Sequence, residues 1–451
     1  MPTAPAPQKR AAAQPSPPKP GLFAFLLGSL LGLALLKFGN PVILDSMVLP
    51  PVDALELIFQ PWPLKWGYLC LLLLIPVGCF AASLRPRPPA PLLGVSLGWL
   101  GWQLLSSTKT ADAHLTAVTL LHFGACFVLF YLGFFALSRE GQLRGLWPGL
   151  LAGYLLMLWF GLEQHYGGLE ASRKQFYEMP DWQQYPPDYL KKIASDRIFS
   201  TLVYPNALAG AILLYFPMLA GAAPHLFKRF PRIAVGVVFG LLTYTSAACL
   251  FWSGSKSGWL IALALFLIFV LHQPFARQAK MILVGCLLAG GLAGFFIKFS
   301  AYFQRGAPSV GARFDYWNAA WATFRDHPVL GTGPGTFSVA YKKIKRPEAE
   351  MAKLTHNDFL EQASDSGFVG FASYFLLVLG SLAVFYRSRE HLDPISRLAG
   401  LGLLGWALQS LVEFPLYIPA LSWPAFVLLG CLWGQIARLG PSEFSRRDIR
   451  K

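Results

Sequence analysis

The chain has 451 residues, of which 55% are hydrophobic and only 14% are charged. A soluble protein of this length carries roughly a quarter charged residues, so the composition excludes a soluble enzyme, a secreted disulfide scaffold and a disordered chain. The net charge of +15 fits nucleic-acid binding, but membrane proteins also concentrate Lys and Arg in their cytoplasmic loops, and we favour that explanation.

The first twenty residues are rich in proline and alanine, and we expect this cytoplasmic segment to be disordered. Apolar runs long enough to cross a bilayer then follow along the chain, and the first is expected to be an uncleaved signal-anchor. These runs predict an all-α polytopic membrane protein of about 12 transmembrane helices. The predicted helices lie near residues 21–38, 66–84, 90–106, 115–137, 146–163, 199–222, 233–252, 257–272, 281–298, 367–385, 398–415 and 418–437.

The positions of the basic residues predict the orientation of these helices. With the N-terminus inside, the cytoplasmic segments and the basic tail (438–451) hold twenty Lys and Arg residues, whereas the short connections on the opposite side hold five. Both termini are therefore expected in the cytoplasm. Two long segments, 164–198 and 299–366, then lie on the periplasmic side, the second between helices 9 and 10. Long loops in a compact fold are usually functional, so we expect the chemistry there.

The second long segment contains a predicted helix over residues 311–327, near the start of which Arg313 lies. Arg313, Trp317, Ala320, Trp321 and Phe324 share one face, and this aromatic face is expected on the membrane surface or against the bundle. Glycines at 331, 333 and 335 follow. Such a run can cradle a phosphate, but this one comes after a helix and not after a strand, so a tight turn is the favoured interpretation.

A further helix is expected from Thr355, which forms a capping box with Asp358. Asp358, Glu361 and Asp365 share one stripe of this helix, whereas His356 points roughly the opposite way. A metal site built from these residues is therefore not expected. A lone histidine at a helix start is more often structural than catalytic, and spacing alone leaves both roles open.

Two other cations occur at predicted membrane boundaries. Lys256 lies in a short polar break, 253–258, and Arg197 precedes a segment in which Pro205 and Asn206 are expected to interrupt the helix and present a polar amide. Contact with the membrane interface would explain either cation. However, four basic side chains lie on the same predicted face, which suits an anionic headgroup such as a lipid diphosphate. They are Arg197, Lys256, Arg313 and His356.

The order of these motifs resembles the O-antigen ligase and polymerase superfamily. The motifs are YPNALAG, SGSKSGWL, an Arg-x3-Trp followed by HPVLGTGPGTF, and THNDFLEQASDSGFVG. The most specific pattern, HN-x2-L-x4-(E/D)-x-G-x2-G, is matched by His356, Asn357, Leu360, Asp365, Gly367 and Gly370. The resemblance covers residues 199–375 by motif and the whole chain by topology.

The resemblance implies a metal-independent, inverting glycosyltransferase without a cofactor. It would transfer a glycan from an undecaprenyl-diphosphate carrier to a hydroxyl of lipid A-core or another glycan, at the periplasmic face of the inner membrane. Arg313 and His356 would be catalytic, with His356 as the base. Substrate-binding positions would be Arg197, Lys256, Asn206, Asn357 and Asp365. Lysine at 256 replaces the usual arginine of a Ser-Arg-Gly motif and loses bidentate geometry, and Asp365 replaces the usual glutamate.

Several alternatives remain open from the sequence. A repeat-unit polymerase of O-antigen or exopolysaccharide, or a protein glycosyltransferase, would use the same chemistry with another acceptor. A transporter or flippase for lipid-linked oligosaccharide would more often place its ionisable groups at the bilayer midplane, where this chain has few. A scaffold subunit of a polysaccharide assembly would keep the fold without needing His356.

Overall fold

The computed structural model describes residues 21–84, 86–139, 143–185 and 187–439. All regular structure in these ranges is helical, which confirms the predicted all-α class. The N-terminal segment expected to be disordered (1–20) and nearly all of the basic tail lie outside the described residues.

The longer helices of the first half are α1 (Leu22–Lys37), α2 (Ala54–Phe59), α3 (Leu64–Ala81), α4 (Ala90–Ser106), α5 (Ala113–Ala136), α6 (Leu143–Glu163), α7 (Leu169–Tyr177), α8 (Pro187–Ile193) and α9 (Pro205–Leu226). Those of the second half are α10 (Arg232–Trp252), α11 (Lys256–Leu271), α12 (Arg277–Gln304), α13 (Pro308–Asp326), α14 (Phe337–Ile344), α15 (Asp358–Phe375), α16 (Ser381–Ser388), α17 (Pro394–Gln409) and α18 (Pro419–Arg438). Short 3-10 and π-helical turns join several of them.

Eight helical stretches in the described part of the chain are long and apolar enough to cross a membrane. They are Leu64–Ala81, Ala113–Ala136, Leu143–Tyr177, Pro205–Leu226, Arg232–Trp252, Arg277–Gln304, Asp358–His391 and Pro419–Arg438. The helices α1 and α11 are apolar but shorter. A helix overlaps each of the twelve predicted ranges, but the predicted count of about twelve membrane spans is not confirmed.

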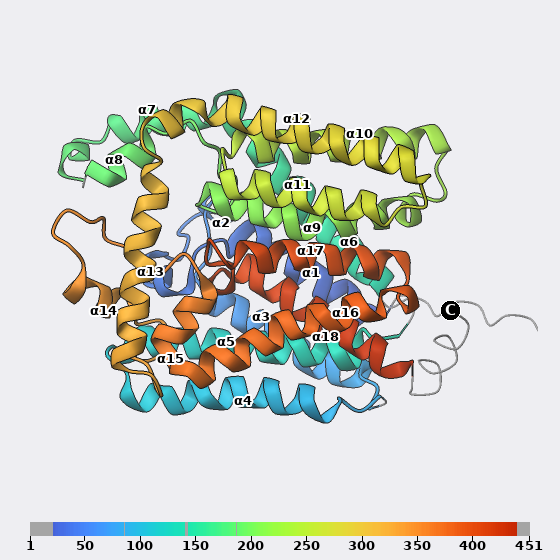
Figure 1. Cartoon of the computed structure of the whole chain (residues 1–451), viewed down its shortest axis with the longest axis horizontal. Coiled ribbons are helices and arrows are strands. Elements are labelled where there is room, and N and C mark those ends of the chain that lie inside the picture. Colours follow the sequence, from blue (N-terminus) through green and yellow to red (C-terminus); the bar gives the residue numbers. More distant parts are fainter. Residues whose placement is uncertain (1–20, 85, 140–142, 186, 440–451) are drawn as a thin grey trace, which may run out of the picture.

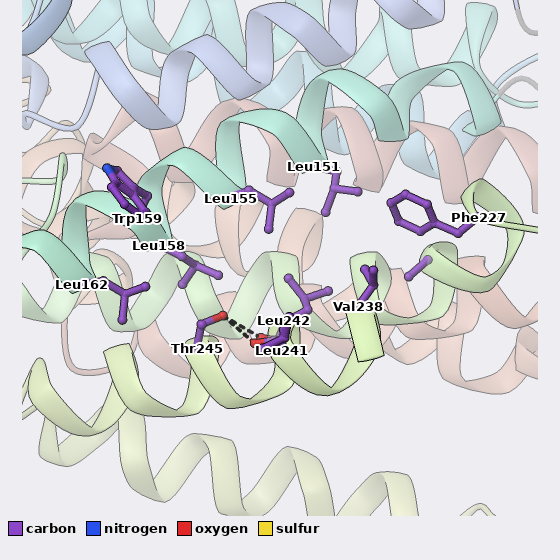
Figure 2. A pocket seen from close by; sticks show the side chains of 11 residues that line it. Leu151, Leu155, Leu158, Trp159, Leu162, Phe227, Val238, Leu241, Leu242 and Thr245 are labelled. Carbon is purple, nitrogen blue, oxygen red and sulfur yellow. Dashed lines mark hydrogen bonds between the residues drawn. The ribbon is translucent and has the colours of Figure 1, made fainter. Parts of the chain in front are cut away.

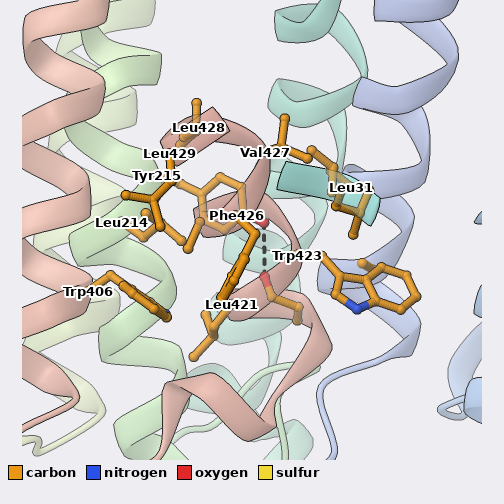
Figure 3. Close-up of a cluster of buried hydrophobic side chains, with 14 of the residues drawn as sticks. Leu31, Leu214, Tyr215, Trp406, Leu421, Trp423, Phe426, Val427, Leu428 and Leu429 are labelled. Atoms are coloured by element: carbon orange, nitrogen blue, oxygen red, sulfur yellow. Dashed lines mark hydrogen bonds between the residues drawn. The ribbon is translucent and has the colours of Figure 1, made fainter. Parts of the chain in front are cut away.

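The core of the bundle forms around α18, where 83% of the most apolar stretch is buried. Trp423 and Phe426 on this helix pack among side chains from the neighbouring helices, including Tyr215 of α9 and Trp406 of α17 (Figure 3). The Tyr215 hydroxyl donates a 2.9 Å hydrogen bond to the carbonyl oxygen of Ala420 at the start of α18. The helix α12, by contrast, is only 11% buried and lies at the periphery.

The helices α1 and α6 pack with their backbones in close approach. Gly28 and Gly32 on α1 meet Gly149 and Gly153 on α6. A Cβ atom on Gly28 would lie 2.1 Å from the carbonyl oxygen of Leu146, and one on Gly153 would lie 2.4 Å from the Cα of Gly32. Small residues four positions apart permit this contact between membrane helices. Any larger side chain would push α1 out of the core.

A buried polar network fixes α15 on α4. The side-chain oxygen of Gln362 accepts hydrogen bonds of 2.9 Å from both Trp99 and Gln103 of α4. Ser366 in turn donates a 2.5 Å hydrogen bond to the side-chain oxygen of Gln103. Because buried polar groups are costly unless they are paired, this network specifies one position for α15.

Several predicted helix boundaries differ by a few residues, and at two of those that were wrong a proline lies nearby. The helix expected over 199–222 begins only at Pro205, because proline disfavours a helical conformation in the residue before it and is well suited to the first helical position. The helix expected over 398–415 ends at Gln409. Residues 410–418 instead form an irregular connection with a short turn at Pro415–Tyr417, where proline cannot donate a helical hydrogen bond.

Most of the long helices run side by side, and α13 crosses their ends (Figure 1). The helices α7, α8 and α14 lie at that same end of the bundle, as does the start of α15. The two long segments predicted to carry the chemistry meet at one pocket, which Asp196 and Arg197 of the first and Phe299 of the second line.

Candidate active site

A single buried carboxylate, Glu413, joins three residues that lie far apart in the sequence. It belongs to the connection between α17 and α18, and only 5% of its side chain is exposed. Its Oε1 accepts hydrogen bonds from Nη2 of Arg313 and, at 2.5 Å, from Nδ2 of Asn206. Its Oε2 lies 3.0 Å from Nδ1 of His356. We call these four residues together with Arg197 the Glu413 network.

Arg197 enters the network through Asn206. Its Nη2 donates a 2.7 Å hydrogen bond to Oδ1 of Asn206, and its Nε donates one of the same length to the carbonyl oxygen of Ser253. The start of α9 is thereby tied both to the turn that precedes α11 and, through the Asn206 amide, to Glu413. Four of the residues predicted for the site are thus brought together: Arg197, Asn206, Arg313 and His356.

Arg313 is held at three points. Besides the ion pair with Glu413, its Nε donates to the carbonyl oxygen of Val412 at 3.0 Å and its Nη1 donates to that of Ser309 at 3.2 Å. The guanidinium therefore links α13 to the connection between α17 and α18. Its charge is largely matched by Glu413.

His356 adopts a backbone conformation that residues other than glycine seldom adopt, with φ at +54°. Its ring stacks on Tyr316 of α13 at a centroid distance of 5.7 Å and meets the edge of Phe414 at 4.8 Å. The side chain is 27% exposed. A strained backbone held between aromatic rings is typical of a residue whose position matters for function.

The electrostatics of the network favour an ionised Glu413. Burial by itself would raise the pKa of this carboxyl, but the charge and hydrogen bond of His356 and those of Arg313 outweigh it and hold the pKa below its ordinary value. Opposite charges and donated hydrogen bonds both stabilise a carboxylate. Glu413 therefore provides a fixed negative charge that orients the basic groups around it.

Lys256 lies beside the network but is not hydrogen-bonded to it. It opens α11, which Ser255 caps by accepting a hydrogen bond from the backbone of Gly258. Its Nζ lies 3.8 Å from the centroid of the Tyr302 ring. Lys256 and Arg197 line the same pocket, so the predicted cation at this position does face the predicted site.

Asn357 and Asp365, also predicted to bind substrate, are hydrogen-bonded to the backbone. Asn357 is the N-cap of α15 and accepts hydrogen bonds from the backbone N–H groups of Phe359 and Leu360. The predicted capping box at Thr355 was therefore wrong by two residues. Asp365 is fully buried, and its Oδ2 accepts a 2.7 Å hydrogen bond from the backbone of Gly335.

The glycine run at 331–335 forms a tight turn whose donors serve this protein's own groups. All three glycines have positive φ, and the backbone N–H of Gly333 donates to the carbonyl oxygen of Asp365 at 2.8 Å. A Cβ on Gly331 would lie 2.2 Å from the backbone of Asp365. The turn is packed against α15, which supports the tight-turn interpretation over a phosphate cradle.

The remaining carboxylates of the predicted stripe also serve the fold. Asp358 accepts a hydrogen bond from the backbone of Leu416, and Glu361 accepts one from the backbone of Thr355. Both are buried, and neither faces His356. Within the described residues, no group of three or more His, Cys, Asp and Glu side chains is placed to hold a metal ion.

The predicted aromatic face of α13 is mostly not the face that packs on the protein, and its expected place on the membrane surface stays a prediction. The residues that this helix buries are Tyr316, Ala319, Ala320 and Thr323, so only Ala320 belongs to the predicted face. Trp321 is 52% exposed. Tyr316 takes the buried position because its ring packs against His356 and Tyr341, contacts that helical spacing alone does not reveal.

Sequence reasoning missed Glu413, although a signal was present. It is the only charged residue between Arg397 and Arg438. A single carboxylate in so long an apolar stretch is by default a functional candidate. Its assignment to the interior of a predicted helix concealed it.

Part of the chain is similar to a known protein family. Residues 241–375 match the family model described as O-antigen ligase. The matched part contains Lys256, Arg313 and His356, and it confirms the predicted resemblance to the O-antigen ligase and polymerase superfamily. Together with the eight apolar helices, it supports a multi-pass membrane protein that is similar to O-antigen ligases over this part of the chain.

A relative from Haemophilus influenzae, described as an uncharacterized protein, is 26% identical over 36% of this chain. The matched part spans 45% of that relative's length, so it carries no activity over to this chain.

Proposed function

We propose that this chain is an O-antigen ligase-like transferase of the bacterial inner membrane. It would move a glycan from an undecaprenyl-diphosphate carrier to a hydroxyl of lipid A-core or of another glycan. The observation that carries the proposal is the Glu413 network, which joins a histidine base to two arginines within the fold that the family match supports. A ligase and a repeat-unit polymerase would share this chemistry and differ only in the acceptor.

His356 is the proposed general base. With Nδ1 donating to the ionised Glu413, the imidazole is held in the tautomer whose Nε2 carries a free lone pair. Nε2 takes the proton from the acceptor hydroxyl while the oxygen attacks the anomeric carbon of the donor. A positioned base of this kind contributes roughly 10²–10⁴-fold to the rate.

The leaving group departs as a lipid diphosphate with the electrons of the broken carbon–oxygen bond. Its growing negative charge is met by fixed cations, namely Arg197 of the network and Lys256, which lines the same pocket as Arg197. Preorganised charges stabilise such a transition state without reorganising during the reaction. A single displacement inverts the configuration at the anomeric carbon, and the charge is balanced without a metal ion.

The proposed location of the chemistry is the periplasmic face, with both chain termini cytoplasmic. Support comes from the asymmetry of basic residues and from the end of the bundle where α13, α7 and α8 gather (Figure 1). A transporter for the same lipid would place its charges along a path through the bundle. The Glu413 network instead lies at one end of it.

The test is His356→Ala in the native host, with surface glycan resolved on a gel and membrane level followed by immunoblot. The exposed His114 at the start of α5 offers a matched control, His114→Ala. We expect H356A to abolish surface glycan at normal protein level while lipid-linked precursor accumulates on the periplasmic side. A normal glycan profile in H356A would refute the proposed role.

A further inference from the structure

A pocket of about 330 Å³ opens next to the Glu413 network. It is lined by His165, Asp196, Arg197, Trp252, Gly254, Lys256, Lys298 and Phe299. We call its four basic residues, His165, Arg197, Lys256 and Lys298, the cation pocket. They come from four separate places in the chain, so the pocket is a product of the tertiary fold and not of one charged run.

The two lysines rest on aromatic rings and not on carboxylates. Nζ of Lys298 lies 3.1 Å from the centroid of Phe251, and Nζ of Lys256 lies 3.8 Å from that of Tyr302. Both also approach Phe299, at 5.9 Å and 5.1 Å. Among the described residues, neither lysine has a carboxylate within ion-pair distance. Two like charges held over one ring repel each other, which an anion between them would relieve.

The one acidic residue of the pocket is engaged elsewhere. Asp196 accepts a 2.8 Å hydrogen bond from Arg173 of α7, and 93% of its side chain is exposed. It therefore does not neutralise the lysines. His165 completes the wall, with its ring stacked on Trp252 at 3.7 Å. The pocket keeps a surplus of positive charge.

Arg313 differs from the two lysines of the cation pocket, because its charge already has a partner. The charge of Arg313 is paired with Glu413, and its remaining donors are bound to backbone carbonyls. Lys256 and Lys298 have no such partners in the described chain. An incoming anion would therefore find unpaired positive charges in the cation pocket. The Glu413 network would hold the base.

An apolar groove beside α6 and α10 indicates which kind of anion the cation pocket would bind. It has a volume of about 250 Å³, and its lining comes from α6, α10 and the end of α9 (Figure 2). Leu162 of α6 and Thr245 of α10 lie at one end of it, and Phe227 lies at the other. His165 follows Leu162 by one helical turn, and Trp252 follows Thr245 by two. The groove thus leads toward the stacked pair that walls the cation pocket.

We propose that the cation pocket binds the diphosphate of the lipid donor, with Lys298 and His165 as binding residues and the lipid's apolar chain in the groove between α6 and α10. The proposal rests on the proposed function, because it assigns that donor's place. It shifts the diphosphate away from Arg313 toward Lys256, Lys298 and Arg197. A ligand that is anionic at one end and apolar along its length fits both cavities.

The test measures binding of farnesyl diphosphate to the purified full chain in nanodiscs of zwitterionic lipid. Lys298→Ala should raise the Kd about tenfold or more, because a charge-assisted contact is lost, and Lys298→Arg should restore most of the affinity. Lys280→Ala, at the other end of α12, is the matched control and should bind like the wild type. Lys298→Gln, which keeps the length of the side chain, serves if K298A does not fold. Unchanged affinity in the folded variant would overturn the proposal.

Two further binding measurements show which kind of anion the cation pocket recognises. Inorganic diphosphate should bind more weakly than farnesyl diphosphate, and equal affinity would overturn the role of the groove. Nanodiscs that contain phosphatidylglycerol should not abolish the binding. If they do, the pocket recognises any anionic headgroup, and the assignment to the donor is wrong.

The two proposals fail in different ways. His356→Ala should bind farnesyl diphosphate as the wild type does, because its defect lies in proton transfer. If glycan transfer requires His356 but K298A leaves the KM for the donor unchanged, only the cation pocket is refuted. If binding depends on Lys298 while H356A transfers glycan normally, the assignment of the cation pocket is supported and the proposed role of His356 is refuted.

Discussion

His356 and Glu413 lie 57 residues apart in the chain, yet Nδ1 of the imidazole and Oε2 of the carboxylate are 3.0 Å apart. The second oxygen of the same carboxylate pairs with Arg313. One side chain therefore sets the ring orientation of the proposed base and the position of a guanidinium. The positions of His356 and Arg313 relative to each other therefore depend on Glu413.

Replacing Glu413 should damage both stability and activity. In Glu413→Ala, Arg313 and His356 lose their common partner in a buried setting, and breaking such a pair costs about 3–5 kcal/mol. The free energy of unfolding in detergent, measured beside the exposed-site variant Glu178→Ala, checks this. Glu413→Gln should fold better than the alanine variant and still lose transfer. Full activity in E413Q would contradict the role of the negative charge.

Arginine at 313 should not be replaceable by lysine. Three separate N–H groups of Arg313 reach Ser309, Val412 and Glu413, and a lysine ammonium cannot span that arrangement. We expect Arg313→Lys to lower the transfer rate by about 10²-fold, because Glu413, and with it the proposed base His356, is no longer held in place, and a positioned base contributes roughly 10²–10⁴-fold. Arg325→Lys, on an exposed position of the same helix, is the control. A rate within twofold of wild type would show that only the charge matters.

Gly367 should be intolerant of a side chain. It interrupts α15 with φ at +68°, and a Cβ there would lie 2.1 Å from the carbonyl oxygen of Val329. Gly367→Ala should lower the stability by more than about 1 kcal/mol, since the backbone conformation alone costs that much. Gly380→Ala on the continuing helix has open space around its Cβ and should be neutral or slightly stabilising. Equal thermal midpoints of the two variants would refute the prediction.

Acid should weaken the protein partly through Glu413. Its pKa in the folded state lies below the ordinary value of 4.5, so its contribution to stability is fully present above that pH and is lost as the pH falls through the folded pKa. The thermal midpoint of the wild type should therefore fall below about pH 4.5 more steeply than that of Glu413→Gln. Parallel acid limbs for the two proteins would show that this carboxylate is not the group responsible.

Chelators should not affect transfer. In the proposed mechanism, the charge on the departing diphosphate is met by Arg197 and the lysines of the cation pocket, so no ion is required. Activity of the purified protein should be equal before and after dialysis against EDTA. Loss of activity that added magnesium or manganese restores would require a different mechanism.

The sequence predicted the helices well and the site in part. Long apolar runs determine helices locally, which is why helices overlap all twelve predicted ranges. The convergence of Arg197, Asn206, Arg313 and His356 followed from motif order and topology. The residue that joins them, Glu413, pairs with partners up to 207 residues away, and helical periodicity carries no information about such pairings.

Two further residues of the predicted site show another limit of sequence patterns. Asn357 and Asp365 belong to the most specific motif, but a motif does not distinguish a residue that contacts substrate from one that holds a turn. Asp365 accepts a hydrogen bond from the backbone of Gly335 in the glycine turn. Lys298 was interpreted as one charge in a short connection, and the structure shows that it lines the pocket with Lys256 and Arg197.

The Glu413 network draws on five segments of the chain, and the last of them comes after α17. During synthesis, the arginines and the histidine are therefore made well before the carboxylate that organises them. A nascent chain that ends before Glu413 has the basic residues but no carboxylate to join them. The order of residues along the chain thus delays assembly of the network until nearly the whole bundle has been made.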